Sequence, residues 1–140
     1  MCGIGGVLQP GANFTDSFLN QVIQKCLAYN RHRGPDDHGT WHDDYLLLIH
    51  SRLKIVTAHD SAVQPAVSPS GRYVVGFNGE IYNHLALRNL SLVRSHRWRG
   101  ISDTETLAVL IDFYDIHKLL NKFDGMFAIS IWDRLDRILT

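Results

Sequence analysis

The residue best suited to covalent chemistry is Cys2, which follows Met1 directly and precedes a glycine-rich apolar stretch. If Met1 is removed, Cys2 becomes the first residue and carries both a thiol and a free α-amine. The reference pKa values of these two groups are close enough for the amine to take the thiol's proton. A nucleophile with its own base defines an N-terminal nucleophile. The alternative is a small buried cysteine at the start of a strand, and position alone favours that alternative.

Other side chains could complete a site that hydrolyses an amide. Asn78 and Gly79 offer a side-chain amide and an unhindered backbone N–H, the donor types that hold a developing oxyanion. Asn-Gly is also a tight-turn signal, and local evidence favours a plain hairpin turn. Arg52 follows a predicted strand and could pair with a carboxylate, although a surface arginine is the commoner case. Glu80 or Asp103 could receive an ammonium group, so that with Arg52 they would hold both ends of an amino acid.

The composition fits one globular domain and excludes several classes of protein. Fourteen basic and fourteen acidic residues cancel, so the charge footprint of a nucleic-acid-binding protein is missing. No run of eighteen apolar residues predicts a membrane span, and the first residues lack the pattern of a secretory signal. We therefore expect a cytoplasmic protein without nucleic-acid or membrane partners. In a reducing compartment, Cys2 and Cys26 are expected to remain separate thiols.

Metal and nucleotide sites are not predicted. The eight histidines form no His-Glu-x-x-His pattern, and two cysteines separated by a helix do not make a zinc knuckle. His38 and His42 flank Trp41 in a predicted strand region and should not converge. No glycine-rich P-loop is present either. We expect no metal and no cofactor in this domain.

Hydrophobic periodicity predicts a layered α+β domain in which helices are inserted between antiparallel strands. Thr15 is expected to begin an amphipathic helix whose apolar stripe includes Cys26. The charged loop 31–37 is expected either to be solvated or to line a polar site. Asn83 is expected to cap a short helix that runs through Arg88, and Ser102 and Glu105 form a capping box for another. Strands are predicted at 3–8, 39–41, 45–50, 72–77, 80–82, 126–132 and 137–140, a surface loop at 57–71 and a further short helix at 119–123.

Taken in order, six segments resemble the glutaminase domain of the class II glutamine amidotransferases, and most closely that of the asparagine synthetases. Each segment alone is a weak signal, but six in the right order are specific. The resemblance covers nearly the whole chain. The segments are 1–4 (MCGI), 31–36 (RHRGPD), 50–53 (HSRL), 77–83 (FNGEIYN), 102–105 (SDTE) and 125–128 (GMFA).

The resemblance implies a fold and a set of residue roles. The fold would be the four-layer αββα arrangement of N-terminal nucleophile hydrolases, with two antiparallel sheets. Glutamine would be the substrate and Cys2 the nucleophile. The other assigned residues are Asn78 and Gly79 for the oxyanion, Arg52 for the α-carboxylate, Glu80 and Asp103 for the α-ammonium, and the main chain at Leu53 and Ile55 for the pocket lining.

The resemblance also sets expectations for the rest of such a protein. Residues 1–140 would be a glutamine amidotransferase type 2 domain, incomplete at the C-terminal end, because the strand begun at 137–140 lacks a partner beyond Thr140. The synthetase domain, which uses ATP and Mg²⁺ to amidate aspartate or a related carboxylate, would be absent. Residues 97–101 differ from the expected lead-in to Ser102, which leaves the amidated acceptor open. Whether the protein forms a homodimer is also an open question. The competing interpretation of its function is a non-catalytic glutamine-binding or interaction module.

Overall fold

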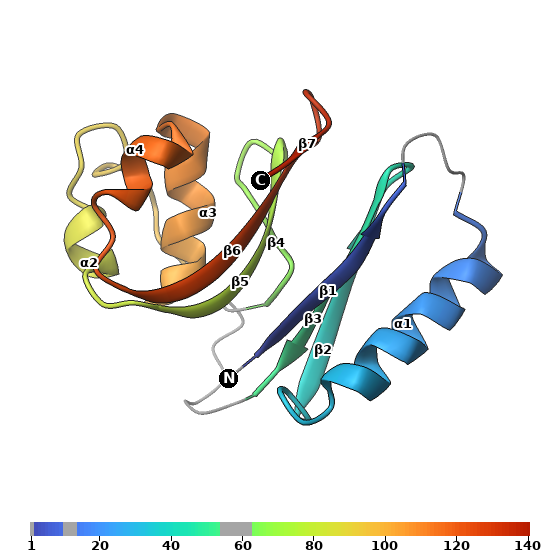
Figure 1. Ribbon diagram of the computed structural model, residues 1–140. Coiled ribbons are helices and arrows are strands. Elements are labelled where there is room, and N and C mark those ends of the chain that lie inside the picture. The colour runs from blue at the N-terminus through green and yellow to red at the C-terminus, as the bar shows by residue number, and fades with distance from the viewer. Residues whose placement is uncertain (1, 10–13, 54–62) are drawn as a thin grey trace. The chain divides into compact units, whose positions relative to one another are not determined.

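The computed structural model describes residues 2–9, 14–53 and 63–140. These residues belong to two compact units, Met1–Thr57 (unit 1) and Ala58–Thr140 (unit 2), which are considered separately. Each unit contains one antiparallel sheet and at least one helix (Figure 1). The prediction of an α+β protein with two antiparallel sheets is therefore confirmed.

The described residues of unit 1 form a three-stranded sheet with one helix. The strands lie in the order β1-β3-β2, and β3 pairs with both neighbours. The hairpin between β2 and β3 turns at Asp43, whose carboxylate accepts hydrogen bonds from the backbone N–H groups of Tyr45 at 2.8 Å and Leu46 at 2.9 Å. The elements are β1 (Gly3–Leu8), α1 (Asp16–Asn30), β2 (Asp37–His42) and β3 (Leu46–Arg52).

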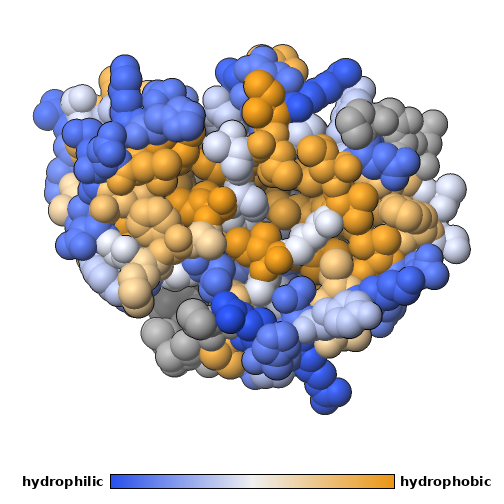
Figure 2. Space-filling model, viewed as in Figure 1, coloured by the Kyte–Doolittle hydropathy of each residue, from blue (hydrophilic) through white to orange (hydrophobic). Residues whose placement is uncertain are grey.

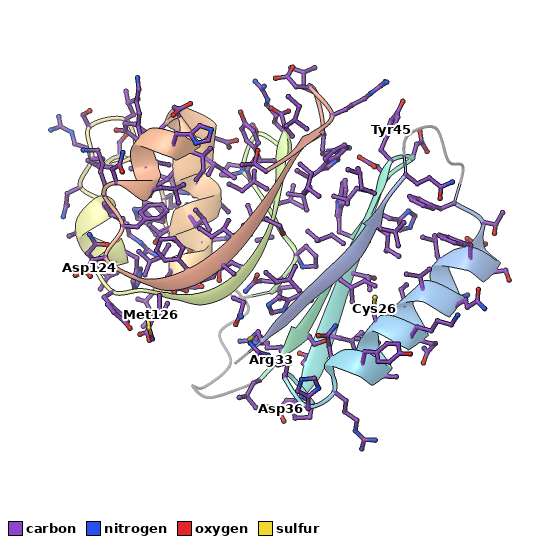
Figure 3. The ribbon with its side chains drawn as sticks, in the orientation of Figure 1. Cys26, Arg33, Asp36, Tyr45, Asp124 and Met126 are labelled. Carbon is purple, nitrogen blue, oxygen red and sulfur yellow. The ribbon has the colours of Figure 1, made fainter. Side chains whose placement is uncertain are left out.

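Helix α1 covers one face of this sheet, as its periodicity predicts. Thr15 is the N-cap, and its hydroxyl accepts a hydrogen bond from the backbone N–H of Phe18 at 3.3 Å. Leu19 packs on Leu47 and Ile49 of the central strand. This contact removes apolar surface of both the helix and the strand from water, which stabilises the unit. Figure 3 shows Cys26 on the side of α1 that faces the sheet, which confirms its prediction as a packing residue.

Unit 2 is a four-stranded sheet in the order β4-β5-β6-β7. Its centre is the ladder between β5 and β6, which runs in register from Tyr73 opposite Asp133 to Ile81 opposite Gly125. Arg72 closes one end of this ladder with a two-pronged pair to Asp133, at 2.6 and 3.0 Å. The elements are β4 (Ala66–Val67), β5 (Tyr73–Ile81), α2 (His84–Leu87), α3 (Asp103–Phe113), α4 (Ile116–Leu120), β6 (Gly125–Asp133) and β7 (Ile138–Leu139).

The core of unit 2 lies between its helices and one face of its sheet. Alternate residues of β5 supply that face, because side chains in a strand point to opposite sides. Helix α3 packs against them with its apolar side, and Leu107 and Leu110 are fully buried there. Polar residues of α4 lie outward, and Figure 2 shows hydrophilic residues at the upper left over this helical part. The β5 residues of this core are Val75, Phe77 and Ile81.

The predicted turn at Asn78 and Gly79 is wrong, because β5 continues through both residues. Asn78 pairs with Ala128 and Gly79 with Phe127 in the β5–β6 ladder. Gly79 has a φ of +146°, and a Cβ there would lie 2.1 Å from the carbonyl oxygen of Met126. The glycine is therefore needed for close approach of the strands and not for a reversal of the chain.

The capping of α2 and the start of α4 differ from the prediction. Asn83 precedes α2, but its side chain makes no cap bond; its amide donates to the carbonyl of Lys122 at 2.8 Å and accepts from the N–H of Asp124 at 3.1 Å. It therefore ties α2 to the segment that precedes β6. Helix α4 begins earlier than predicted because the carboxylate of Asp115 caps it, accepting from the N–H of Lys118 at 3.1 Å.

Nothing in the described ranges 2–9, 14–53 and 63–140 is a helix long and apolar enough to cross a membrane.

The core of unit 2 gives a direct stability prediction. Leu110→Ala should lower the free energy of unfolding by about 2–5 kcal/mol, because it removes a side chain with no exposed surface and leaves a cavity. Leu120→Ala is the matched control, since that leucine is 39% exposed at the end of α4. Chemical denaturation of both variants checks this expectation. Equal losses would contradict the placement of the core.

Candidate functional site

In unit 1, strand register brings Cys2 and Arg52 to the same end of the sheet. Gly3 pairs with Ser51 in the β1–β3 ladder, and extending that register by one residue aligns Cys2 with Arg52. Opposite residues of an antiparallel pair project on the same face, with Cβ atoms about 4.5–5.5 Å apart. Arg52 is the last residue of β3, which continues two residues beyond the predicted strand 45–50. A thiol and a guanidinium therefore start from adjacent positions on the face opposite α1.

The loop 31–37 packs against the backbone of this strand end. A Cβ on Gly34 would lie about 2.5 Å from the carbonyl carbon of Ser51 and 2.6 Å from the nitrogen of Arg52. The N–H of Asp36 donates to the carbonyl of Arg52 at 3.1 Å. Figure 3 shows Arg33 and Asp36 at this end of the sheet. The glycine thus lets the loop fix the main chain from which the Arg52 side chain extends.

The other two predicted pocket residues follow Arg52. Leu53 comes directly after β3 and is half-buried. Ile55 lies outside the described residues. The predicted residues that the structure places together in unit 1 are therefore Cys2, Arg52 and Leu53.

In unit 2, β5 carries three of the predicted residues and α3 carries the fourth. Asn78 and Glu80 alternate with the core residues, so they lie on the sheet face that is turned away from the helices. Asp103 begins α3, and its carboxylate accepts from the N–H of Ile81 at 3.2 Å and from that of Thr104 at 2.8 Å. Asp103 is thereby held beside the residue that follows Glu80.

Two neighbouring carboxylates repel each other unless positive charge lies between them or near them. Asp103 is partly stabilised by the two N–H donors and by its position at the positive end of α3. Glu80 is exposed. Both carboxylates are acceptors, the type of group that the N–H donors of an ammonium need.

The capping box of α3 is only half formed. The Ser102 hydroxyl accepts from the N–H of Thr104 at 3.1 Å, as a cap should. Glu105 does not reach back to Ser102; its carboxylate accepts from the N–H groups of Arg99 at 2.7 Å and Gly100 at 3.0 Å. Glu105 is only 4% exposed, and it organises the segment that leads into α3.

Sequence patterns missed Gln64, which the prediction placed in a surface loop. Its side-chain oxygen accepts from the N–H of Phe77 at 2.6 Å, and its amide nitrogen donates to the hydroxyl of Thr104 at 3.4 Å. One side chain therefore connects the residue before Asn78 with the residue after Asp103. Only its position before Pro65 marked it in the sequence.

Sequence patterns also missed Thr106, whose buried hydroxyl contacts several polar groups. Its hydroxyl donates to the carbonyl of Ser102 at 3.2 Å and accepts from Nε of Arg88 at 2.8 Å. Nδ1 of His84 lies 3.3 Å from the same oxygen. Whether Nδ1 donates to this hydroxyl or accepts from it depends on the tautomer of His84.

His84 is half-buried between opposing charges. Burial is the main cause of the lowered pKa of His84, and the positive charge of Arg88 acts in the same direction. The carboxylates of Asp103 and Glu80 raise the pKa of His84 and offset part of this effect. The neutral imidazole is therefore the favoured form beside the two candidate ammonium-binding groups.

A separate cavity of about 510 Å³ lies elsewhere in unit 2 and includes none of the predicted site residues. It is bounded by β4, α3 and the segment before α3. Within the part of the chain that the structure describes, no group of three or more histidine, cysteine or acidic side chains is arranged to hold a metal ion.

The environment of His84 predicts a pH dependence of stability. Because its pKa is lower in the folded state than the unfolded value of about 6.5, the unfolded chain binds more protons, and stability is lost as the pH falls below about 6.5. His84→Gln should flatten that part of the profile. The free energy of unfolding measured between about pH 5.5 and 7.5 checks it, with exposed His117→Gln as control. Identical profiles for both variants would contradict it.

Comparisons with known proteins agree with this arrangement of motifs. Residues 1–140 match the family model described as glutamine amidotransferase domain. Among similar proteins, asparagine synthetase [glutamine-hydrolyzing] 1 of Bacillus subtilis (strain 168) is 33% identical over 99% of this chain and 22% of its own length. A probable asparagine synthetase [glutamine-hydrolyzing] of Schizosaccharomyces pombe is 41% identical over 96% of this chain and 23% of its own.

Asparagine synthetase [glutamine-hydrolyzing] 1 of Saccharomyces cerevisiae is 37% identical over 99% of this chain and 23% of its own length. The chain thus spans less than a quarter of these relatives. The match of the family model over residues 1–140 shows that this chain belongs to the class II glutamine amidotransferase domain family.

Proposed function

We propose that this chain hydrolyses the side-chain amide of L-glutamine to glutamate and ammonia, with Cys2 as the nucleophile. The observation that carries the proposal is the register of β1 and β3, which, extended by one residue, aligns Cys2 with Arg52 at one end of the unit 1 sheet. In this alignment a nucleophile and a carboxylate-binding group lie at neighbouring strand ends. A substrate that carries both an amide and a carboxylate needs these two groups close together. Membership of the glutamine amidotransferase family supports glutamine as that substrate.

The substrate's charged end would be bound by ionic groups. Arg52 would pair with the α-carboxylate, while Glu80 and Asp103 would accept the α-ammonium. The anchoring of Asp103 to the N–H of Ile81 supports this role, because a carboxylate held by fixed donors loses little freedom on binding. The main chain at Leu53 and Ile55 would line the pocket.

The reaction would proceed through a thioester. After removal of Met1, the α-amine of Cys2 takes the thiol proton, and the sulfur attacks the amide carbon of glutamine. The side-chain amide of Asn78 and the N–H of Gly79 stabilise the oxyanion. The C–N bond then breaks, the amine delivers the proton, and ammonia leaves. Water attacks the thioester, which releases glutamate and restores the thiol.

The ammonia acceptor would belong to a longer protein. The relatives are named asparagine synthetases, and this chain matches less than a quarter of their length. We assign residues 1–140 as the glutamine amidotransferase type 2 domain of such a protein. Amidation of aspartate or a related carboxylate, with ATP and Mg²⁺, falls to the synthetase domain that the chain does not include.

Within the α+β class, we assign the chain to the four-layer αββα fold of N-terminal nucleophile hydrolases. Its support is that each unit supplies one antiparallel sheet with helices against one face. Helix α1 covers the sheet of unit 1, and α3 packs on that of unit 2.

Replacing the proposed nucleophile tests the function. Cys2→Ala should abolish glutamate release while leaving glutamine binding nearly intact, because the binding groups are elsewhere in the chain. Cys26→Ala is the matched control, since that cysteine packs between α1 and the sheet. Intact mass, a glutaminase assay and labelling with a glutamine-like electrophile, applied to the same sample, check the expectation.

The outcomes separate an enzyme from a binding module. Loss of the Met1 mass, turnover and one adduct on Cys2 would support the N-terminal nucleophile mechanism. A processed Cys2 that binds glutamine without turnover or labelling would favour the binding module. Loss of glutamine binding in Cys2→Ala would contradict the assignment of the charged groups.

The proposed oxyanion donor gives a second kinetic test. Asn78→Ala should lower kcat by roughly a hundredfold to a thousandfold with little change in KM, because the donor acts mainly on the developing charge. Exposed Asn89→Ala, in the same unit, serves as control. An unchanged kcat in Asn78→Ala would contradict the role of this amide.

A further inference from the structure

A buried arginine lies behind the start of α3, outside the set of residues that the proposed reaction uses. Arg88 follows α2 and is only 8% exposed. Its guanidinium lies over the ring of Trp98, with 4.0 Å from the guanidinium carbon to the ring centroid. Burying a cation costs free energy unless hydrogen-bond acceptors surround it. The acceptors around Arg88 therefore show which parts of the chain it holds in place.

The guanidinium fork contacts three points on the segment that enters α3. Nη1 donates to the carbonyl of Gly100 at 2.7 Å, and Nη2 donates to the carbonyl of Ser102 at 2.9 Å. Nε donates to the hydroxyl of Thr106 at 2.8 Å, in the first turn of the helix. The planar fork therefore fixes residues before, at and after the helix start in one orientation.

Asp103 lies between the two contacts that enclose the helix start. Its neighbour Ser102 is held through the carbonyl, and Thr106 is held through the hydroxyl. The Asp103 carboxylate then meets the N–H of Ile81, at the end of β5. Movement of the helix start would move this carboxylate away from the end of β5.

Charge supports the same arrangement. Glu105 is buried, and its Oε2 lies 3.9 Å from Nη2 of Arg88. Glu105 also accepts from the N–H groups of Arg99 and Gly100, so the positive group and the negative group hold the same short segment from two sides. Burial lowers the pKa of Arg88 and the Glu105 charge raises it; the group remains a cation because an arginine pKa starts far above neutrality.

We propose that Arg88 is a positioning residue for substrate recognition: by clamping the start of α3, it sets the Asp103 carboxylate against β5 so that it can receive the α-ammonium of glutamine. This inference rests on the proposed function. Arg88 itself touches no substrate. Its effect is therefore specific to the ammonium end of the substrate and not to the amide that is cleaved.

The test compares two substrates that differ only in the group that Asp103 binds. L-glutamine carries the α-ammonium, and 4-carbamoylbutanoate is the same molecule without it. In Arg88→Met, KM for glutamine should rise about tenfold or more, the size expected when a charge-assisted hydrogen bond is lost. Its kcat should change little, and kcat/KM for 4-carbamoylbutanoate should stay within about twofold of wild type.

Two further variants keep the test decisive. Arg88→Lys retains the positive charge but cannot reach three acceptors, so its KM for glutamine should lie between those of wild type and Arg88→Met. Exposed Arg94→Met should behave as wild type with both substrates. Thermal unfolding shows whether each variant folds. If Arg88→Met does not fold, Arg88→Lys carries the comparison.

A double-mutant cycle identifies the group through which Arg88 acts. In an Asp103→Asn background, Arg88→Lys should cause no further rise in KM for glutamine, because the carboxylate that it positions is already gone. Additive effects, or equal losses for both substrates in the folded single variants, would overturn the proposal and assign Arg88 to general stability.

A failure of this proposal is distinguishable from a failure of the proposed function. If wild type binds glutamine without turnover, equilibrium Kd values for the two ligands replace KM, and the same comparison decides the role of Arg88. If wild type neither binds nor hydrolyses glutamine, the proposed function and this inference are both overturned. Normal wild-type turnover with no substrate-specific effect at Arg88 overturns the inference alone.

Discussion

The ladder between β5 and β6 is the constraint on which the rest of unit 2 depends. Its register places one set of β5 side chains in the core and leaves Asn78 and Glu80 on the opposite face. A slip by one residue would exchange the two sets, bury the polar groups and expose the core. Gly79 maintains this register because a Cβ would meet the β6 backbone. The same glycine is the proposed oxyanion donor, so pairing and chemistry depend on one position.

The helix start beside this ladder is organised by ionic groups that are mostly buried. Asp103 joins α3 to β5 through the N–H of Ile81, and Gln64 joins the same two elements through Phe77 and Thr104. Arg88 and Glu105 hold the segment behind them. Such a network is stable only when its donors and acceptors are satisfied together, which gives it one geometry. A carboxylate held in that way is suited to recognise a charged ligand.

In unit 1, a candidate site residue is held in place mainly by strand pairing and backbone packing, and less by polar side chains. A strand buried from Leu46 to Ser51 lies between two partners and ends at Arg52. The loop that contains Gly34 packs on this end and fixes the backbone there. Cys2 lies at the neighbouring strand end because β1 and β3 share a register. The strand end at Arg52 is therefore fixed by strand pairing and close backbone contact.

Local patterns in the sequence determined the helix from Asp16, the buried strand that leads to Arg52 and the ordered motifs that identify the family. These features depend on neighbours in the chain, so periodicity and residue type are sufficient to predict them. The tertiary structure decided that Asn78 and Gly79 continue a strand, because the partner strand β6 is far away in the sequence. It also decided the partners of Arg88 and Glu105. Long side chains reach whichever acceptors the fold brings near, and no local pattern specifies those acceptors.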